Sequence, residues 1–405
     1  MSQQRTSLDP QSTNTGALGG LRILDLTRLL PGAFCSQILA DLGADVLKIE
    51  EPKAGDYNRT FPPMAKTESG SFLLLNRNKK SLTLNLKTVA GKEIFNQLSR
   101  DADVVLEGFR PGVMDRLGLG FDELAKTNSR LIYCAISGYG QDGPYRLKPG
   151  HDLNYMAIAG ALQLFGTASG GPNVPGLSVA DVGGGSLMAL AGILAAVIAR
   201  GRTGKGQFID ISMTDGAVSW LALHGADHLF AGIEPRGGGR PLIGQAPCYN
   251  VYRCADDRYV ALGIIEPHFW ERFCKAVDAH DLIDEQWPTG AAADRQFARL
   301  RTLFAGKPRD TWVRDLAEAD IPFTAMNSMA EAFADPQLVH RKMLLEVEHP
   351  LEGTIPQLGF PIKMSATPCA IYAAPPRLGE HTDATLTTMG YDAQAIATLR
   401  AEGAV

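Results

Sequence analysis

The sequence predicts an α/β protein in which a large Rossmann-like domain with a parallel sheet is joined to a smaller α+β domain. Three observations lead to this fold class. The chain has 405 residues, which is longer than a domain with one hydrophobic core usually is. Of these residues 45% are hydrophobic and 20% charged, a composition that suits a soluble globular protein. Strand-like and helix-like segments alternate up to about residue 150, as in a parallel sheet covered on both faces. A glycine-rich break at 232–247 then indicates a domain boundary.

A strand–helix–strand unit opens the folded part of the chain. The segments LRILDLTRLL and ADVLKIEEP have the composition of short strands, and GAFCSQILADLG between them is expected to form a helix. The segment SLTLNL is compatible with another strand. A helix is then predicted at 89–103, a strand at 104–109, a helix at 121–129 and a strand at 131–140.

Two buried helices are expected next, at 150–166 and 182–199, followed by a strand and a long helix within 206–232. The 182–199 segment is uncharged and as long as a short membrane-spanning helix. It is, however, rich in Gly and Ala and follows Asp181 directly, and no second segment of this kind occurs. We therefore predict a closely packed core helix and no membrane partner.

The second half of the chain begins with a predicted hairpin at 249–265, turning at Asp256–Asp257. Helices are predicted at 266–277 and 309–321, and the Pro-rich tail is expected to be extended with a short final helix. The predicted division is a disordered leader at 1–18, the large domain at 19–231, the small domain at 232–335 and a C-terminal segment at 336–405.

Charge and composition exclude several classes of function. The net charge of −5 gives no basic footprint for nucleic acid or a membrane surface. The six cysteines lack the C-x-x-C spacing of common zinc and redox motifs, so no metal site is predicted. The polar N-terminus has no apolar core of a secretory signal, which favours a cytoplasmic protein with free thiols.

The segment GYGQDG at 138–143 matches the spacing of a dinucleotide-binding loop. Such a loop should follow the first strand and open a helix, whereas this one comes late and continues into the loop beginning at Pro144. We therefore expect a turn at the end of a strand and no nicotinamide cofactor.

Three residues are candidates for acid–base chemistry. His151 follows a Pro-Gly turn in PGHDLNY, where a neutral imidazole at a helix start could accept a proton; the alternative is a hydrogen-bonded core histidine. Asp181 precedes three glycines, so it is either a plain helix N-cap or a reactive carboxylate beside exposed N–H groups of Gly183 and Gly184. Glu266, between a strand and Pro267, is by itself an ordinary helix-start acid.

Three cations lie near predicted strand ends, which is where α/β sheets bind ligands. These are Lys79, Lys80 and Arg110, and their charge suits the binding of phosphate. The alternative, an ordinary solvated basic surface, is equally compatible with the sequence.

A series of motifs resembles the class III (family III) CoA-transferase superfamily. In order they are LADLGADVLKIEEP, NRNKKSLTLNL, EGFRPGVMDRLGLG, SGYGQDGPY, GHDLNY, VADVGGGS and EPHF, and they cover the chain from about residue 19 into the 360s. Within the superfamily, the His of GHDLNY and the Glu-Pro of EPHF resemble the α-methylacyl-CoA racemase branch. Transferases of the superfamily typically lack this His and use the aspartate as a nucleophile.

The resemblance implies a racemase of 2-methylacyl-CoA thioesters acting through an enolate. His151, supported by Glu266, would serve one face of the substrate Cα and Asp181 the other. Backbone N–H groups at the start of the Asp181 helix would hold the enolate oxygen. No cofactor is implied, because the CoA thioester is itself the substrate.

The resemblance also implies the binding residues and the assembly. Arg110, Lys79 and Lys80 would meet the CoA phosphates, and Leu86, Tyr155, Gly183 and Gly184 would line the substrate site. The family commonly carries an Arg where this chain has Glu51, and Lys53 is the expected substitute for that contact. The implied assembly is an interlocked homodimer in which the C-terminal segment returns to the large domain.

Two other functions are compatible with the sequence. A class III CoA-transferase would use Asp181 as its nucleophile, since the same aspartate serves both chemistries. A catalytically silent CoA-binding protein is disfavoured because His151, Asp181 and Glu266 are all present. The acyl group cannot be read from the sequence, and the role of Asp152 is left open.

Overall fold

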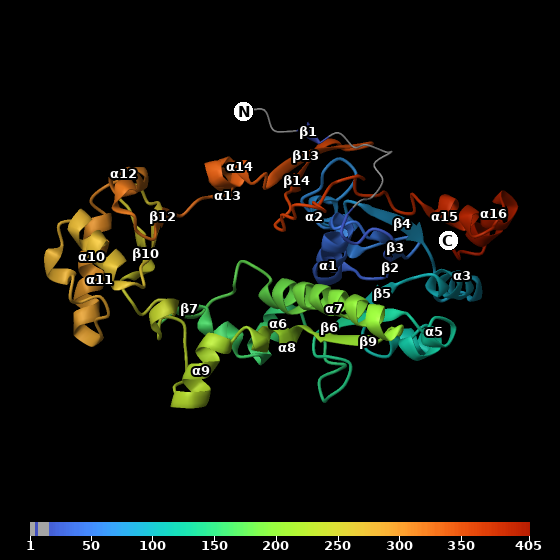
Figure 1. Cartoon of the computed structure of the whole chain (residues 1–405), viewed down its shortest axis with the longest axis horizontal. Coiled ribbons are helices and arrows are strands. Elements are labelled where there is room, and N and C mark those ends of the chain that lie inside the picture. Colours follow the sequence, from blue (N-terminus) through green and yellow to red (C-terminus); the bar gives the residue numbers. More distant parts are fainter. Residues whose placement is uncertain (1–4, 7–15) are drawn as a thin grey trace. The chain divides into compact units, whose positions relative to one another are not determined.

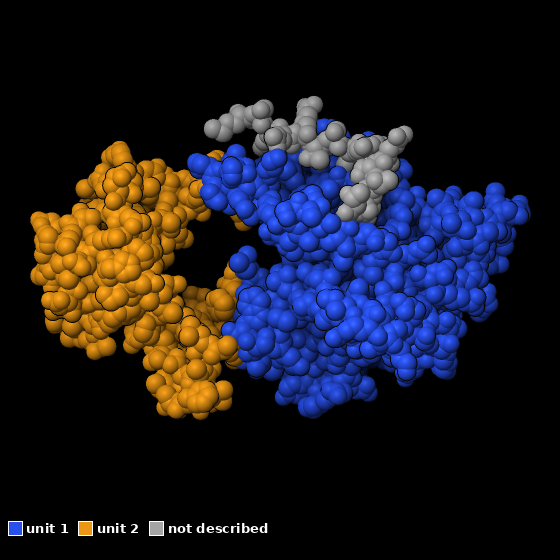
Figure 2. Space-filling model, viewed as in Figure 1, with its two compact units in different colours: residues 1–159, 177–220, 336–405 blue, residues 160–176, 221–335 orange. Residues whose placement is uncertain are grey.

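A computed structural model of the chain describes residues 5–6 and 16–405 (Figure 1). These residues divide into two compact units, coloured separately in Figure 2. Unit 1 contains residues up to Ala159, Leu177–Trp220 and Pro336–Val405, and unit 2 contains Gly160–Gly176 and Leu221–Asp335. Residues 160–176 and 221–231, which the predicted division placed in the large domain, thus belong to unit 2. The glycine-rich break lies inside unit 2, because glycines mark turns and not the limits of a packed core.

Unit 1 is built on a six-stranded parallel sheet, which confirms the predicted α/β fold class. Its strands are β2 (Arg22–Asp25), β3 (Asp45–Glu50), β4 (Lys79–Thr83), β5 (Val104–Glu107), β6 (Ile132–Ser137) and β9 (Phe208–Ser212). Their order is β4-β3-β2-β5-β6-β9, and every neighbouring pair is parallel. The chain builds outward from β2 to β4 and then returns beside β2 as β5. The sheet therefore has its topological switch point between β2 and β5.

Helices cover both faces of this sheet. On one face, α1 (Leu29–Asp41) packs against β3 and β5, and α7 (Met188–Thr203) lies along β6 and β9 (Figure 1). On the other face, α3 (Val89–Arg100), α5 (Phe121–Thr127) and α16 (Ala393–Ala401) share a core with alternate strand residues such as Leu24, Leu47, Val105 and Tyr133. This alternation along buried strands is what a parallel sheet requires.

The apolar segment after Asp181 forms one continuous helical stretch. It begins as the π-helix η3 (Ala180–Leu187) and continues as α7. By length and composition alone, the helix Ala180–Thr203 could span a membrane. Gly192 of α7 lies against Ile209 of β9, so packing on the sheet also accounts for the apolar residues of this helix.

The C-terminal segment of unit 1 contains structure that the sequence did not predict. Instead of an extended tail, it forms the antiparallel pair β13 (Leu344–His349) and β14 (Gly353–Leu358). The strand β1 (Arg5–Thr6) is parallel to β13. The predicted leader thus falls mainly on 1–4 and 7–15, outside the described residues. Its last part, 16–18, is anchored because the Leu18 N–H donates to the Leu42 carbonyl at 2.9 Å.

The remaining helices of unit 1 are short. They are α2 (Gly70–Leu75), α4 (Val113–Leu117), α6 (Asp152–Ile158), α8 (Met213–Ser219), α14 (Pro336–His340) and α15 (Thr382–Thr388). The predicted buried helix at 150–166 is therefore only the two turns of α6, with Leu153 and Ile158 exposed.

Unit 2 has its own core around a small antiparallel sheet. The predicted hairpin is confirmed as β10 (Tyr249–Arg253) and β11 (Tyr259–Gly263), with Asp257 in the left-handed region at φ 61°, and β12 (Phe323–Ala325) pairs with β11. Aromatic side chains from Trp270, Phe304 and Trp312 fill the core. Its other elements are the two-residue pair β7 (Gly166–Thr167) and β8 (Gly171–Pro172), and α9 (Ala222–Ala231), α10 (Pro267–Ala276), α11 (Gly290–Phe304), α12 (Arg309–Asp315) and α13 (Met329–Ala334).

Candidate active site

The carboxyl ends of β2 and β5 mark the candidate site, because open α/β sheets bind ligands at their switch point. The loop after β2 carries Thr27 and Arg28 and leads into Leu29, the first residue of α1, and the loop after β5 carries Phe109 and Arg110. Leu29 adopts a left-handed conformation at φ 62°, which is costly for a residue with a side chain. The surrounding structure must therefore hold this loop in place.

A buried ion pair holds the loop after β2. The Lys48 ammonium lies 2.8 Å from an Asp56 carboxylate oxygen and donates to the Thr27 carbonyl at 2.7 Å. The other Asp56 oxygen accepts the Leu29 N–H at 3.1 Å. Burial alone would raise the pKa of Asp56, but Lys48 brings it below its ordinary value. Asp56 is thus ionised and constrains Leu29.

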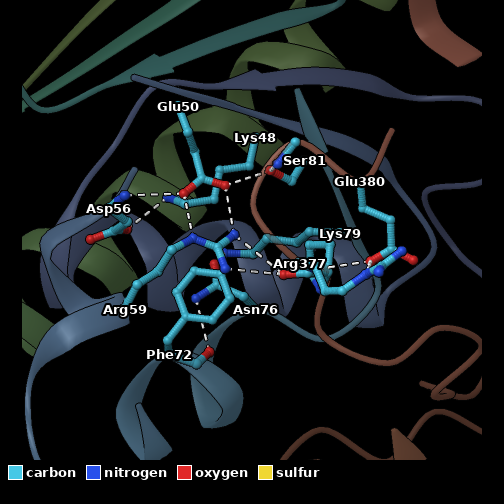
Figure 3. A network of polar contacts seen from close by, with 12 residues as sticks. Lys48, Glu50, Asp56, Arg59, Phe72, Asn76, Lys79, Ser81, Arg377 and Glu380 are labelled. Carbon is cyan, nitrogen blue, oxygen red and sulfur yellow. Dashed lines mark hydrogen bonds and ion pairs between the residues drawn. The ribbon is translucent and has the colours of Figure 1, made fainter. Parts of the chain in front are cut away.

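Figure 3 shows the larger polar network around this pair. The Arg59 guanidinium makes two hydrogen bonds of 2.8 Å to Glu50 and lies over the Phe72 ring. Ser81 donates to Glu50 at 2.6 Å. The network joins β3, β4 and the segment after β3, so it fixes the strands beneath the candidate site.

The structure does not support the predicted phosphate contacts of Lys79 and Lys80. These are the first two residues of β4, so they lie at the amino edge of the sheet, opposite the switch-point loops. Lys79 is buried and donates to the Ala33 carbonyl and to Asn76 (Figure 3). Lys80 is half exposed and pairs with Asp45 at 2.8 Å. The prediction placed both lysines near a strand end without distinguishing the two ends, and only the carboxyl end of a parallel strand lies at the binding edge.

The other predicted binding residues lie nearer the carboxyl edge. Arg110 is exposed in the loop after β5, and its positive charge works to lower the pKa of Tyr155. Leu86 follows β4 and packs partly buried against the core. Glu51 folds back onto its own turn, where its carboxylate accepts the N–H groups of Lys53 and Ala54 at 3.0 and 2.7 Å. Glu51 thus shapes this turn.

His151 and Tyr155 are brought together by α6. His151 is the exposed N-cap of the helix, and its backbone N–H donates to the Asn154 side chain at 3.1 Å. Tyr155 is buried and donates its hydroxyl hydrogen to the Gly150 carbonyl. Burial, then the charge of Asp181, raises the pKa of Tyr155 to about 12, so Tyr155 is a neutral wall of the site. The His151 imidazole therefore lies on the surface of unit 1, one turn from Tyr155.

Asp181 is joined to α6 through Asp152, whose role the sequence left open. The Asp152 carboxylate accepts the Asp181 N–H at 3.0 Å. Asp181 is consequently not the N-cap of its helix but lies in the first turn of η3, partly buried. Burial, and secondly the charge of Asp152, raises the pKa of Asp181 from 3.8 to about 7. Near neutral pH this carboxyl can therefore both accept and donate a proton.

The glycines after Asp181 serve close packing. A Cβ on Gly183 would lie 2.8 Å from the Trp220 ring, and one on Gly184 would lie 2.5 Å from the Met213 carbonyl. The reciprocal contact occurs at Gly216, where a Cβ would lie 2.3 Å from the Gly184 Cα. The sequence analysis expected these glycines to line the substrate site. In the structure they have a packing role, because they let η3 approach α8. Whether their N–H groups hold an enolate oxygen stays a prediction.

Glu266 lies in unit 2, whereas His151 and Asp181 lie in unit 1. It is the N-cap of α10, with Pro267 at the first helical position, as the local sequence indicated. Its support of His151 therefore stays a prediction from the resemblance.

The sequence analysis missed Arg28. Its guanidinium lies over the rings of Tyr57 and Phe109 and donates to the Tyr57 hydroxyl at 2.9 Å. The rule that selected Arg110, a cation just after a strand, would also have selected Arg28. The predicted strand at 21–30, however, places Arg28 inside it, so the rule does not apply to Arg28 at the level of sequence.

Comparison with known proteins now identifies the family. Residues 18–382 match the model of CoA-transferase family III. Human succinyl-CoA:glutarate CoA-transferase is 34% identical, over 98% of this chain and 92% of the relative. Human α-methylacyl-CoA racemase is 32% identical, over 95% of this chain and 97% of the relative. The crystal structure of a CaiB/BaiF family protein from Brucella suis superposes with a TM-score of 0.81 at 31% identity, covering 92% of this chain and 99% of that one.

The candidate site therefore offers Asp181, linked through Asp152 to the helix that begins at His151, and the arginines that follow β2 and β5. The model match covers most of the chain, and the relatives that match along almost their whole length are CoA-transferases and a racemase. This chain is an enzyme of CoA-transferase family III.

Proposed function

We propose that this enzyme racemises 2-methylacyl-CoA thioesters by removing and returning the hydrogen on Cα. The observation that carries the proposal is the contact between Asp152 and Asp181, with His151 beside Asp152 at the start of α6. Burial and the Asp152 charge give Asp181 a pKa of about 7. A racemase needs groups that accept a proton in one direction and donate it in the other, and such groups work best with a pKa near the working pH.

The proposed reaction has two proton transfers. In one direction, ionised Asp181 takes the Cα proton, and the electron pair moves into the thioester carbonyl to form an enolate. Protonated His151 then returns a proton to the opposite face of Cα. In the other direction, neutral His151 takes the proton and protonated Asp181 returns one. Glu266 is assigned the support of His151, and a cytoplasmic homodimer is part of the proposal.

The first experiment is mass spectrometry of 2-methylacyl-CoA incubated with the enzyme in D₂O, with and without an added carboxylic acid. Incorporation of one deuterium at Cα with no new CoA ester is the expected result. A new CoA ester that forms only with the added acid, without exchange at Cα, would refute the racemase proposal.

The second candidate is a CoA-transferase, which is favoured by the names of several of the most similar relatives. In this reaction the Asp181 carboxylate attacks the thioester carbonyl, forming an acyl-aspartyl anhydride and releasing the CoA thiolate. The thiolate then attacks the aspartyl carbonyl, which forms an aspartyl-CoA thioester and releases the acyl group as its carboxylate. An incoming carboxylate repeats the two steps in reverse and leaves as the new thioester. This route needs Asp181 fully ionised as a nucleophile.

Replacement of Asp152 by asparagine tests how Asp181 is tuned. Asparagine keeps an oxygen that can accept the Asp181 N–H but removes the negative charge, so the pKa of Asp181 is expected to fall. Burial, the larger cause, should keep it above its ordinary value. For the direction in which Asp181 is the base, the fall of kcat/KM on acidification should therefore move to lower pH. A pH profile identical to that of the wild type would contradict the assignment.

Replacement of His151 by alanine tests the separation of the two faces. Because His151 and Asp181 are assigned to opposite faces, His151→Ala should slow Cα exchange from one enantiomer more than from the other. Glu266→Gln should slow the same enantiomer preferentially if Glu266 supports His151. Single-turnover exchange in D₂O, measured separately for each enantiomer, checks both variants, and equal losses for the two enantiomers would contradict the two-face assignment.

A further inference from the structure

We propose that Arg28 and Arg110 form an oxyanion-binding pair at the switch point, with Arg28 held in position by the rings of Tyr57 and Phe109. The ligand is a phosphate or carboxylate group of the acyl-CoA substrate. The inference rests on the proposed acyl-CoA site, but it assigns a role to Arg28 that the family resemblance did not supply.

The first step is the geometry of Arg28. Its guanidinium carbon lies 5.0 Å from the centre of the Tyr57 ring and 5.5 Å from that of Phe109. One Nη atom donates to the Tyr57 hydroxyl at 2.9 Å. Two rings and one hydrogen bond fix the plane of the guanidinium, so less conformational entropy is lost when it binds a ligand.

The second step is charge. Within residues 5–6 and 16–405, no carboxylate lies within ion-pair distance of Arg28. Asp56, which contacts the next residue, Leu29, is already paired with Lys48 at 2.8 Å. Asp25, at the end of the same strand, accepts hydrogen bonds from Thr27 and from Ser36. The Arg28 charge is therefore available for an anion from solution.

The third step is position. Arg28 follows β2, and Phe109 and Arg110 follow β5, the neighbouring strand across the switch point. The Phe109 N–H donates to the Glu107 carboxyl at 2.6 Å, which holds the backbone that carries the ring lying against Arg28. The positive charge of Arg110 partly offsets the rise in the pKa of Tyr155, and the negative charge of Asp181 adds to that rise. The two arginines thus border the crevice in which such sheets bind ligands.

The fourth step is ligand chemistry. Guanidinium groups bind phosphate and carboxylate through two parallel hydrogen bonds, which a lysine cannot reproduce. An acyl-CoA offers a diphosphate and a 3′-phosphate, and a dicarboxylic acyl group adds a distal carboxylate. All three are oxyanions, so truncated ligands are needed to distinguish them.

The experiment measures binding of five compounds by calorimetry or by competition: CoA, dephospho-CoA, pantetheine, succinyl-CoA and butyryl-CoA. The variants are Arg28→Gln, which removes the charge, and Arg28→Lys, which keeps the charge but not the planar group. Arg22→Gln is the matched control, because Arg22 is an exposed arginine at the opposite end of the same strand. Melting temperatures establish that each variant is folded.

For a diphosphate contact, Arg28→Gln should weaken binding of CoA and of dephospho-CoA by roughly 10- to 100-fold and leave pantetheine unchanged. For a 3′-phosphate contact, only ligands carrying that group should lose affinity. For a distal carboxylate contact, succinyl-CoA should lose affinity relative to butyryl-CoA. In each case Arg28→Lys should restore only part of the loss and Arg22→Gln should bind as the wild type does.

Two results would overturn the inference: unchanged affinity of Arg28→Gln for all five compounds, or an equal loss for all five including pantetheine, as a merely structural role would produce. Because binding is measured without turnover, the two proposals can fail separately. A chain that binds CoA through Arg28 but never exchanges the Cα hydrogen would refute the racemase and leave this inference intact.

Discussion

Replacement of Asp181 by asparagine is expected to lower Cα exchange by roughly 10²–10⁴-fold, the range that a positioned acid or base contributes. The amide has nearly the same shape as the carboxyl but cannot accept the Cα proton or attack a thioester. Both proposed reactions should therefore be lost together. Deuterium incorporation into 2-methylacyl-CoA and transfer of CoA to an added acid are the two assays.

The same variant should not be less stable than the wild type at pH 8. The folded-state pKa of Asp181 is about 7, compared with 3.8 for the ordinary carboxyl. Between these values the folded chain binds a proton that the unfolded chain has lost, so stability due to this group falls as the pH rises toward 7. Above pH 7 the wild type carries the full cost of an ionised, largely buried carboxylate, which Asp181→Asn removes. Its melting temperature at pH 8 should therefore equal or exceed that of the wild type.

An exposed carboxylate provides the control for both measurements. Asp122 lies on α5 and is exposed to solvent, so Asp122→Asn should change neither activity nor melting temperature measurably. Near wild-type exchange by Asp181→Asn would remove Asp181 from the mechanism. Retained transfer with lost exchange would show that the residue is not the nucleophile of a transferase.

Replacement of Arg77 by methionine is expected to destabilise unit 1 by about 3–5 kcal/mol, as for other buried ion pairs deprived of one partner. Arg77 is 2% exposed and makes two hydrogen bonds to Asp41, of 2.9 and 2.7 Å. It also contacts the Leu358 carbonyl and the Gln357 side chain of β14. Removing it leaves the buried Asp41 carboxylate with Asn78 as a side-chain partner at 2.9 Å. Urea-induced unfolding followed by circular dichroism measures the loss.

A surface ion pair provides the matched control for this variant. Lys80 and Asp45 lie 2.8 Å apart but are half exposed, so Lys80→Met should cost only about 0–1 kcal/mol. Similar losses for Arg77→Met and Lys80→Met would contradict the role given to burial. The control also tests the corrected position of Lys80, since affinity for CoA should not change.

Local patterns were enough to nominate His151 and Asp181 as candidate reactive groups, but they did not predict the surroundings of these residues. His151 and Asp181 stood out because each is a polar residue next to an apolar segment. Such a pattern can be recognised without knowing where the helices and strands begin and end. The hydrogen bond that links Asp181 to α6 is made by Asp152, which lies 29 positions before Asp181 in the sequence. Only the packing of α6 against η3 brings that carboxylate to the Asp181 N–H, and no local pattern encodes such a contact.

The sequence by itself determined the α/β class, the alternation of strands and helices and the family. These depend on periodicity and on motifs, which are properties of neighbouring residues. Tertiary structure decided the rest: Lys79 and Lys80 lie at the amino edge, Gly183 and Gly184 pack against α8, and Arg28 lies between two rings. The physical reason is that strand register and burial arise from contacts between distant segments. The two ends of a strand can have the same composition, yet in a parallel sheet they lie at opposite edges, and only the carboxyl edge binds ligands.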